Sequence, residues 1–284
     1  MTDQPTHHLA VIGNPIAHSR SPEIHGHFAA QCGLTLDYQR LLAPADDFAA
    51  TAERFLDQGG LGFNVTVPFK SAAAQWVDRL DSGAAASGAV NTVLIRPDDA
   101  GEQQRWGYNT DGIGLIADLQ RNLGIPLAGQ RVLLLGAGGA AAGVIQPLLA
   151  ADVAQITVAN RTAANARRLA ERFAEITIST FAELAEPYDL VINSTSIGLS
   201  GDEKASTGQG FSDQIPDIVV RGARCYDMLY GPAASFSEFA QGAGAHSSAD
   251  GLGMLVEQAA AAFTLWFGFQ PDTAPVIQAM RAEQ

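Results

Sequence analysis

The stretch Arg131-Val-Leu-Leu-Leu-Gly-Ala-Gly-Gly-Ala-Ala-Ala-Gly143 decides the fold of this chain. Val132 to Leu135 form a short continuous apolar run, which is typical of a strand buried on both faces of a parallel sheet. The next residues fit G-x-G-x-x-A, in which Gly136 allows a tight turn and Gly138 lets backbone approach a pyrophosphate. The Ala-rich run 139–151 predicts a helix whose N-terminal N–H groups attract phosphate. A Gly-rich turn alone is also found as a plain tight turn, but the flanking strand and helix favour a dinucleotide site.

The segment after this helix carries a signal for the kind of dinucleotide. Ile156 to Ala159 predict the next strand, which ends in Asn160-Arg161-Thr162. An NAD-binding domain places Asp or Glu roughly 20 residues past the glycines, on the ribose 2′-hydroxyl. No acid is present here, and the guanidinium of Arg161 matches a 2′-phosphate, so the sequence favours NADP over NAD. A solvated Arg161 is the alternative. Residues 163–192 continue the strand–helix alternation of a doubly wound parallel sheet.

The N-terminal part offers two serines in a loop. Leu9 to Ile12 predict a first strand, and the loop that follows ends in Ser19-Arg20-Ser21-Pro22. Pro22 suits the first turn of a helix, which makes Ser21 a natural N-cap. Capping alone explains Ser21, whereas Ser19 has no such structural need.

A lysine and an aspartate stand at the starts of two further predicted helices. Phe63 to Val67 is strand-like, and a helix is expected from Pro68 to about Leu80. Lys70 falls in its first turn, where the helix dipole disfavours a cation by roughly 0.3–1 kcal/mol. That position suits proton transfer near neutral pH, with a solvated lysine as the alternative. Asp111 begins a long helix reaching about Leu123, and its local explanation is a helix cap.

The composition is that of a globular protein, and it does not argue against a small anionic ligand held by local groups. The 284 residues are enough for two domains, with 47% hydrophobic and 17% charged residues. A net charge of −13 argues against nucleic acid as the main partner. Cys32 and Cys225 form no C-x-x-C, so we expect neither a disulfide framework nor a metal site. With no signal pattern and no apolar run near ~20 residues, we expect a cytoplasmic protein without membrane contact.

Motifs in one order along the whole chain resemble the shikimate dehydrogenase family. The combination is far more specific than any one of its members, and comprises GNPIAHSRSP (13–22), NVTVPFK (64–70), GAVNT (88–92), YNTDGIG (108–114), GAGGAA (136–141), NRT (160–162), NSTSIG (193–198), YDMLYGP (226–232) and DGLGMLVEQAA (250–260).

The resemblance implies an α/β fold of two domains with the active site in the cleft between them. One is an α/β substrate domain of residues 1–111 plus 246–284. The other is a Rossmann-type NADP domain of residues 112–245 with a doubly wound parallel sheet. The implied activity is the reversible NADPH-dependent reduction of 3-dehydroshikimate to shikimate, in chorismate and aromatic amino-acid biosynthesis. The sequence does not distinguish a monomer from a homodimer.

The resemblance also assigns roles to residues of the substrate domain. Lys70 and Asp111 would be the catalytic pair, since hydride transfer to the C3 ketone creates an alkoxide that needs a proton or a nearby cation. Asp111 would orient Lys70 and a substrate hydroxyl. The hydroxyls of Ser19 and Ser21 would hold the shikimate carboxylate. Further substrate contacts are implied for Asn64, Thr66, Asn91, Gln258 and, nearby, Tyr230.

The cofactor residues implied by the resemblance follow the ends of the predicted strands. They are Gly136, Ala137, Gly138, Gly139, Ala140, Asn160, Arg161, Thr162, Thr195, Met228 and Gly251. Relatives often carry a second basic residue a few positions past NRT and Asn after the motif His, where this chain has Asn165 and Gly26. Arg167 or Arg168 is then the candidate to reach the 2′-phosphate, and helix phase allows at most one.

Three other interpretations compete with this one. The nearest is a quinate or dual quinate/shikimate dehydrogenase; Ser at both 19 and 21 favours shikimate, because quinate has an extra hydroxyl. A methyltransferase also uses a G-x-G turn but gives no role to Lys70. A non-catalytic NADP-binding regulator on the same scaffold would have no need of both Lys70 and Asp111.

Overall fold

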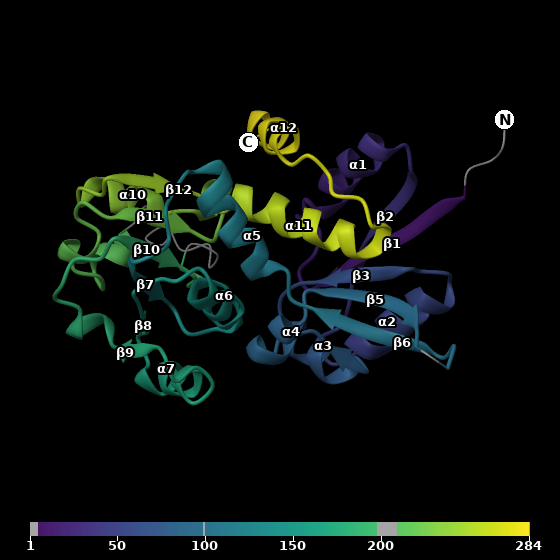
Figure 1. The fold of residues 1–284 in the computed structure, drawn as a ribbon, viewed down its shortest axis with the longest axis horizontal. Helices are drawn as coiled ribbons and strands as arrows, with labels where there is room; N and C mark the ends of the chain where they lie inside the picture. Colours follow the sequence, from purple (N-terminus) through teal and green to yellow (C-terminus); the bar gives the residue numbers. More distant parts are fainter. Residues whose placement is uncertain (1–4, 99, 198–208, 284) are drawn as a thin grey trace. The chain divides into compact units, whose positions relative to one another are not determined.

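The computed structural model describes residues 5–98, 100–197 and 209–283 (Figure 1). The chain divides into two compact units. The first comprises the residues up to Gly114 together with Val256–Glu283, and the second comprises Leu115–Leu255. The α/β fold of two domains expected from the sequence is confirmed. Of the quoted motifs, only NSTSIG reaches outside the described residues, at Gly198.

The first unit is built on a mixed six-stranded sheet in the order β2-β1-β3-β5-β6-β4. The parallel pairs are β1 with β2, β1 with β3, and β4 with β6, whereas β5 is antiparallel to β3 and β6. Its strands are β1 (Thr6–Gly13), β2 (Thr35–Leu42), β3 (Gly62–Val65), β4 (Arg79–Leu80), β5 (Thr92–Pro97) and β6 (Gln103–Tyr108). Its helices are α1 (Ser21–Cys32), α2 (Phe48–Asp57), α3 (Lys70–Trp76), α4 (Ser82–Ser87) and α12 (Ala274–Ala282).

The two faces of this sheet carry different side chains, because successive residues of a strand point to opposite faces. On one face, buried residues of β1 and β3 such as Ile12 and Phe63 pack with Phe48 of α2 and Phe69 into a hydrophobic core. The opposite face therefore carries Leu9, Val11 and Asn64. Asn64 is a polar residue in a strand whose four residues are all buried.

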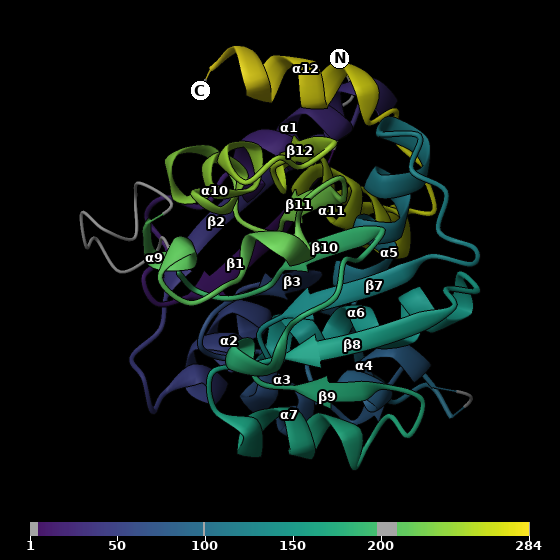
Figure 2. The same ribbon diagram turned by 90° about the vertical axis from the view of Figure 1, so that its left-hand side faces the viewer.

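The second unit is a doubly wound parallel sheet in the order β12-β11-β10-β7-β8-β9. Figure 2 shows β10, β7, β8 and β9 in this order. The strands are β7 (Arg131–Leu135), β8 (Gln155–Ala159), β9 (Thr177–Ser179), β10 (Leu190–Asn193), β11 (Arg224–Asp227) and β12 (Ser247–Ala249). Sequence order reverses between β7 and β10, so the topological switch point, where sheets of this type bind ligands, lies at the carboxyl ends of these two strands.

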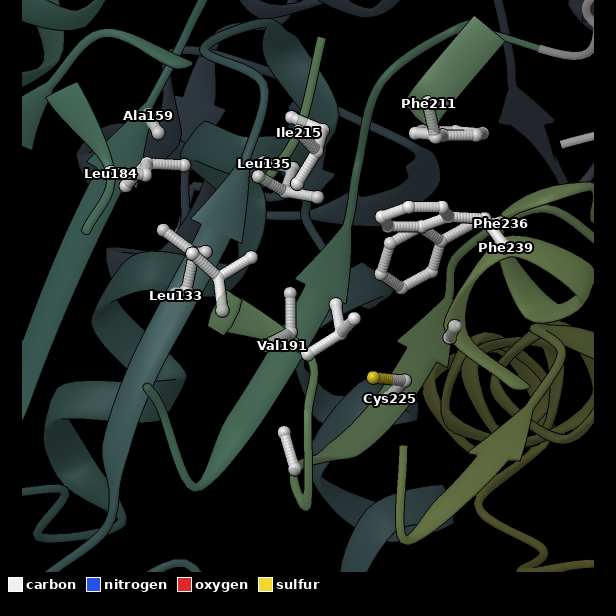
Figure 3. Close-up of a cluster of buried hydrophobic side chains, with 14 of the residues drawn as sticks. Leu133, Leu135, Ala159, Leu184, Val191, Phe211, Ile215, Cys225, Phe236 and Phe239 are labelled. Atoms are coloured by element: carbon white, nitrogen blue, oxygen red, sulfur yellow. The ribbon is translucent and has the colours of Figure 1, made fainter. Parts of the chain in front are cut away.

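Helices connect the strands of the second unit. They are α6 (Gly139–Ala150), α7 (Ala163–Ala170), α9 (Gln209–Ser212) and α10 (Phe236–Gly242), with the short helices η2 (Phe181–Glu183), η3 (Asp217–Val219) and η4 (Gly231–Ala233). One core cluster joins Leu133, Val191 and Cys225, from three neighbouring strands, to Phe211 and Phe236 (Figure 3). This cluster packs α9 and α10 against the sheet.

The chain passes between the units twice, each time within a helix. The first is α5 (Asp111–Ala117), which continues as the π-helix η1 (Asp118–Asn122); the second is α11 (Leu252–Phe267). Residues 246–255, which the sequence groups with the first domain, lie in the second unit because β12 pairs with β11. No helix within the described ranges is long and apolar enough to cross a membrane.

Candidate active site

Lys70 and Asp111 form an ion pair in the first unit. Lys70 is the first residue of α3 and Asp111 the first residue of α5. The Nζ atom of Lys70 donates to Oδ2 of Asp111 at 2.6 Å, and the two side chains are 24% and 10% exposed. The expected helix from Pro68 to Leu80 is shorter, ending at Trp76, but it begins at Lys70 as the helix-start argument requires. The pair is sheltered and still reachable by a small molecule.

Asn91 holds the other oxygen of Asp111. Its Nδ2 donates to Oδ1 of Asp111 at 2.8 Å, and lies 2.9 Å from Oγ1 of Thr110 and 3.3 Å from Oε1 of Gln258. Its Oδ1 accepts from the backbone N–H of Thr110 at 2.9 Å and from the hydroxyl of Thr92 at 3.0 Å. Asn91 is buried, and its polar atoms are directed at protein groups. The carboxylate of Asp111 is engaged at both oxygens, so capping does not explain it.

Asn64 connects the network to β2. Its Nδ2 donates to the carbonyl of Asn91 at 3.1 Å and to the hydroxyl of Thr92 at 3.0 Å. Its Oδ1 accepts from the hydroxyl of Tyr38 at 2.6 Å. Both N–H donors of Asn64 are therefore used by the protein, and its Oδ1 retains one lone pair for a ligand donor.

Ser19 and Ser21 lie together at the start of α1. The Oγ of Ser19 donates to the Oγ of Ser21 at 3.2 Å, and the Nε of Arg40 donates to the carbonyl of Ser19 at 2.8 Å. The N-cap of α1 is Arg20, whose side chain makes no capping hydrogen bond, and the N–H of Ser21 donates to Oγ of Ser19 at 3.3 Å. The expectation that Ser21 is the N-cap is wrong: Ser21 is the first helical residue, and its hydroxyl faces that of Ser19.

Thr66 follows β3, and its side chain is partly exposed. A Cβ at Gly13 would lie 2.4 Å from Cγ2 of Thr66, so the small residue at 13 makes room for this threonine. No hydrogen bond to the Thr66 hydroxyl occurs within the described residues, which leaves it available to a ligand. Tyr230, the remaining substrate candidate, belongs to the second unit and stands at the N-cap of η4.

Two aromatic residues beneath the substrate candidates have strongly shifted pKa values. Burial raises the pKa of the Tyr38 hydroxyl well above its usual 10, opposed by a hydrogen bond from Ser21. Burial lowers the pKa of His25 to about 3, partly offset by the side chain of Asn64. The two rings stack with centroids 4.6 Å apart and planes 8° apart. At neutral pH the phenol keeps its proton and the imidazole is uncharged.

The Gly-rich turn of the second unit has the geometry of a phosphate-binding turn. Gly136 has φ +102°, and a Cβ there would lie 2.9 Å from Oγ of Ser194. Gly138 is the N-cap of α6, and a Cβ built on it, or on Gly139, meets no atom within 4 Å. The first N–H groups of a helix have no intrahelical acceptor. These donors, with Ala137 and Ala140 beside them, fit the pyrophosphate of a dinucleotide.

Asn193 and Asp227 organise the ends of β10 and β11. Nδ2 of Asn193 donates to Oδ1 of Asp227 at 2.9 Å, while Oδ1 of Asn193 accepts from the N–H and the hydroxyl of Thr195 at 3.0 and 2.7 Å. Asp227 also accepts from the N–H groups of Leu229 and Phe236. Burial raises the pKa of Asp227 to about 6, opposed by these donors. Through these hydrogen bonds the buried carboxylate holds in place the loops that carry Thr195 and Met228.

Met228 and Gly251 lie in contact. A Cβ at Gly251 would lie 2.5 Å from the carbonyl oxygen of Met228, and the N–H of Gly251 donates to the carbonyl of Leu229 at 2.8 Å. Both residues are near the carboxyl end of β11, at the sheet edge reached by the Gly-rich turn. Only glycine allows this close approach of the two chain segments.

The segment 160–162 follows β8 at the same edge. Nδ2 of Asn160 donates to the carbonyl of Thr162 at 2.9 Å, and Thr162 is the N-cap of α7. Arg161 is exposed and makes no hydrogen bond or ion pair with the described residues, so its guanidinium is available to an anion. Of the two later arginines, Arg168 donates to Oδ1 of Asn165 at 2.9 Å.

The structure therefore brings the predicted residues into two groups, one in each unit. The substrate and catalytic candidates other than Tyr230 form the first group, and the cofactor candidates lie along one edge of the second sheet. Four residues of these networks were not predicted from the sequence: Tyr38, Thr110, Asn193 and Asp227. The last three lie inside quoted motifs and at strand or helix ends, whereas nothing local marks Tyr38.

The chain is similar to known proteins over most of its length. Three family descriptions match the chain: "Shikimate dehydrogenase substrate binding domain" over residues 11–93, "Shikimate / quinate 5-dehydrogenase" over 118–203 and "Shikimate 5'-dehydrogenase C-terminal domain" over 251–281. The first runs from within β1 to within β5, and the second includes the Gly-rich turn.

Individual relatives match over nearly their whole length. The shikimate dehydrogenase (NADP(+)) of Halorhodospira halophila is 50% identical over 96% of this chain and 98% of its own. An Ael1 enzyme from Pseudomonas putida has a TM-score of 0.85 at 38% identity, covering 96% and 97%. A shikimate 5-dehydrogenase from Thermus thermophilus, in complex with NADP(H) and shikimate, has a TM-score of 0.81 at 31% identity, covering 98% and 100%. With this identity over its full length, the chain belongs to the shikimate dehydrogenase family.

Proposed function

We infer that this chain catalyses the reversible NADPH-dependent reduction of 3-dehydroshikimate to shikimate, a step of chorismate and aromatic amino-acid biosynthesis. The observation that carries this conclusion is the Lys70–Asp111 ion pair at 2.6 Å in a chain of this family. A non-catalytic regulator would have no use for a lysine and an aspartate assembled in this way.

Reduction of the ketone requires a proton donor in the protein. NADPH, when bound, supplies a hydride to the C3 carbonyl carbon of 3-dehydroshikimate. The carbonyl oxygen then gains negative charge, and the ammonium of Lys70 donates a proton to it, forming the hydroxyl of shikimate. In the oxidation direction Lys70 takes that proton back. One of its three N–H bonds points to Asp111, which leaves two for the substrate.

The role of Asp111 is to orient Lys70 and a hydroxyl of the substrate. Oδ2 is held by Lys70 and Oδ1 by Asn91, so the carboxylate plane is fixed before substrate binds. Each carboxylate oxygen accepts more than one hydrogen bond, so Asp111 can also accept from a substrate hydroxyl beside the reacting carbon. Asn91 and Gln258 support this arrangement through Thr110.

We further propose that the residues of the first unit bind the acid. The paired hydroxyls of Ser19 and Ser21 suit a planar carboxylate, and the free hydroxyl of Thr66 and the open lone pair of Asn64 suit ring hydroxyls. Tyr230 is proposed as a further contact, on the family resemblance alone. In this assignment residues 1–111 with the C-terminal segment form the substrate domain, and the unit containing the Gly-rich turn binds the cofactor.

For the cofactor we propose that NADP lies along the carboxyl edge of the second sheet. The turn 136–140 suits the pyrophosphate, and Thr195, Met228 and Gly251 line the neighbouring loops. Asn160, Arg161 and Thr162 suit the adenosine end, with Arg161 on the 2′-phosphate. The free guanidinium of Arg161 supports this role.

We also propose a location and an oligomeric state for this protein. A cytoplasmic location fits the two free cysteines, since reducing compartments keep thiols unpaired. A monomer or a homodimer is expected, and analytical ultracentrifugation distinguishes them.

One measurement tests the function. The purified protein is mixed with NADP and shikimate, and the absorbance of reduced nicotinamide is followed. We expect absorbance to rise with shikimate, and to rise at least about a hundredfold more slowly for the Lys70→Ala variant. A wild-type protein that binds NADP and leaves shikimate unoxidised would contradict the proposed function.

A further inference from the structure

Tyr38 reaches across a strand of the first sheet to the substrate candidate Asn64. Tyr38 is on β2 and Asn64 on β3, and β1 lies between these strands. Tyr38 is in register with Leu9 of β1, and Asn64 with Val11, so all four side chains belong to the same face of the sheet. The Tyr38 hydroxyl donates to Oδ1 of Asn64 at 2.6 Å.

With this hydrogen bond, the protein satisfies every polar position of the Asn64 side chain except one lone pair of Oδ1. The carbonyl of Asn91 can only accept, so the Nδ2 of Asn64 faces it and Oδ1 faces Tyr38. With both N–H groups directed at Asn91 and Thr92, the second lone pair of Oδ1 is the position left for a ligand. Whatever fixes Oδ1 therefore fixes the one group of Asn64 that can receive a substrate hydroxyl.

Tyr38 is itself held in place. Its ring stacks on His25 of α1 at 4.6 Å, and His25 in turn contacts Phe28, Phe263 and Trp266. His25 is fully buried, and neither ring nitrogen has a partner at hydrogen-bond distance among the described residues, although the side chain of Asn64 is close enough to raise the pKa of His25 against the effect of burial. The imidazole thus acts as a flat packing surface that leaves the phenol ring little freedom to move.

We propose that Tyr38 is a positioning residue for substrate binding, holding Oδ1 of Asn64 as the acceptor of a ring hydroxyl of shikimate. This role rests on the proposed function, because it needs Asn64 to contact the substrate. It makes Tyr38 a determinant of substrate affinity without contact to the reacting atoms.

The direct test is Tyr38→Phe, which removes the hydroxyl and keeps the stacked ring. We expect the KM for shikimate to rise about three- to tenfold, the value of one hydrogen bond, with kcat within about twofold and the KM for NADP unchanged. Loss of folded protein alone would lower the apparent kcat and leave KM unchanged. Tyr188→Phe in the second unit is the matched control, because that ring faces Arg131 and its hydroxyl has no hydrogen bond to the described residues.

A double-mutant cycle tests whether Tyr38 acts through Asn64. In an Asn64→Ala background, Tyr38→Phe should raise KM by less than about twofold, because the group it positions is gone. Multiplicative effects in the double variant, or an unchanged KM in Tyr38→Phe, would overturn the proposal while leaving the proposed function intact.

A measurement that needs no catalytic turnover separates the positioning role of Tyr38 from the proposed function. The side-chain amide signals of Asn64 in a nitrogen–proton correlation spectrum, assigned by their loss in Asn64→Ala, should shift in Tyr38→Phe and stay in place in Tyr188→Phe. Signals that do not respond to Tyr38→Phe would refute the positioning role even if the protein oxidised no shikimate.

Discussion

Asn91 donates a 2.8 Å hydrogen bond to Oδ1 of Asp111, the carboxylate oxygen that Lys70 does not take. The carboxylate is therefore held from two sides by side chains from two other segments of the chain. A catalytic group whose orientation is set before substrate binds loses little freedom in the reaction, which is how positioning lowers a barrier.

Lys70→Ala should lower kcat about 10²- to 10⁴-fold, the usual contribution of a positioned proton donor. KM for shikimate should move much less, because the groups proposed to hold the carboxylate and ring hydroxyls remain. Steady-state kinetics in both directions measure this. Lys70→Arg serves as the control that keeps the cation near Asp111 but exchanges protons poorly, and it should stay strongly impaired. A near-normal kcat in Lys70→Ala would remove Lys70 from the mechanism.

Arg161→Ala should weaken NADP binding by about 1–3 kcal/mol, the range for a charge-assisted hydrogen bond. NAD binding should hardly change, because NAD lacks the 2′-phosphate. Calorimetric titration with both cofactors gives the comparison, and Arg221→Ala, also exposed in the second unit, is the control. Equal losses for NADP and NAD would make Arg161 a structural residue.

Gly138→Ala and Gly136→Ala should separate cofactor binding from folding. At Gly138 the new Cβ meets no protein atom, so the protein should fold normally but bind NADP at least about tenfold more weakly, because the methyl occupies space the pyrophosphate approaches. At Gly136 the φ of +102° and the contact with Ser194 should lower stability as well. Thermal unfolding and NADP titration of both variants test this. Unaltered NADP affinity in Gly138→Ala would place the pyrophosphate elsewhere.

Shikimate should be preferred over quinate by at least about tenfold in kcat/KM. Quinate carries an extra hydroxyl on the carbon that bears the carboxylate, and burying it beside Ser19 and Ser21 without a good partner costs about 1–3 kcal/mol. Ser21→Thr should narrow the gap by changing the group that lines this end of the site. Comparable turnover of both acids by the unmodified protein would move it to the dual-specificity branch of the family.

Asp227 should make the stability of the second unit depend on pH. Its folded-state pKa of about 6 is above the unfolded value of 3.8, so between these pH values the folded state binds more protons than the unfolded state. Its contribution to the free energy of unfolding should therefore fall as pH rises from about 4 to 6, by roughly 3 kcal/mol at 1.36 kcal/mol per pKa unit.

Urea unfolding of wild type and Asp227→Asn across this pH range isolates the effect of the carboxylate. The difference between the two free energies should change with pH in the stated direction. Asp46→Asn, at an exposed carboxylate, is the control for the loss of a charge. A difference that stays constant from pH 4 to 7 would contradict the assignment.

The amino-acid sequence by itself determined what depends on neighbours along the chain. The buried strand, Gly-rich turn and helix of 131–150 could be predicted because a positive φ at Gly136 and an exposed helix start at Gly138 follow from residue type and spacing. The predicted position of Lys70 at a helix start is confirmed, because it too depends on neighbouring residues along the chain. The family order of the motifs gave the class of reaction, which the relatives support.

The tertiary structure decided everything that depends on which segments meet. Ser21 was predicted to be a helix cap, but its hydroxyl faces Ser19, because a side chain takes the partner that folding brings near. β12 joined the second unit because its backbone groups pair with β11. Tyr38 carries no local signal at all: its partner Asn64 lies two strands away, and only the strand order β2-β1-β3 brings them together. Sheet order is fixed by long-range pairing of strands with buried faces, and local sequence patterns do not show which strands pair.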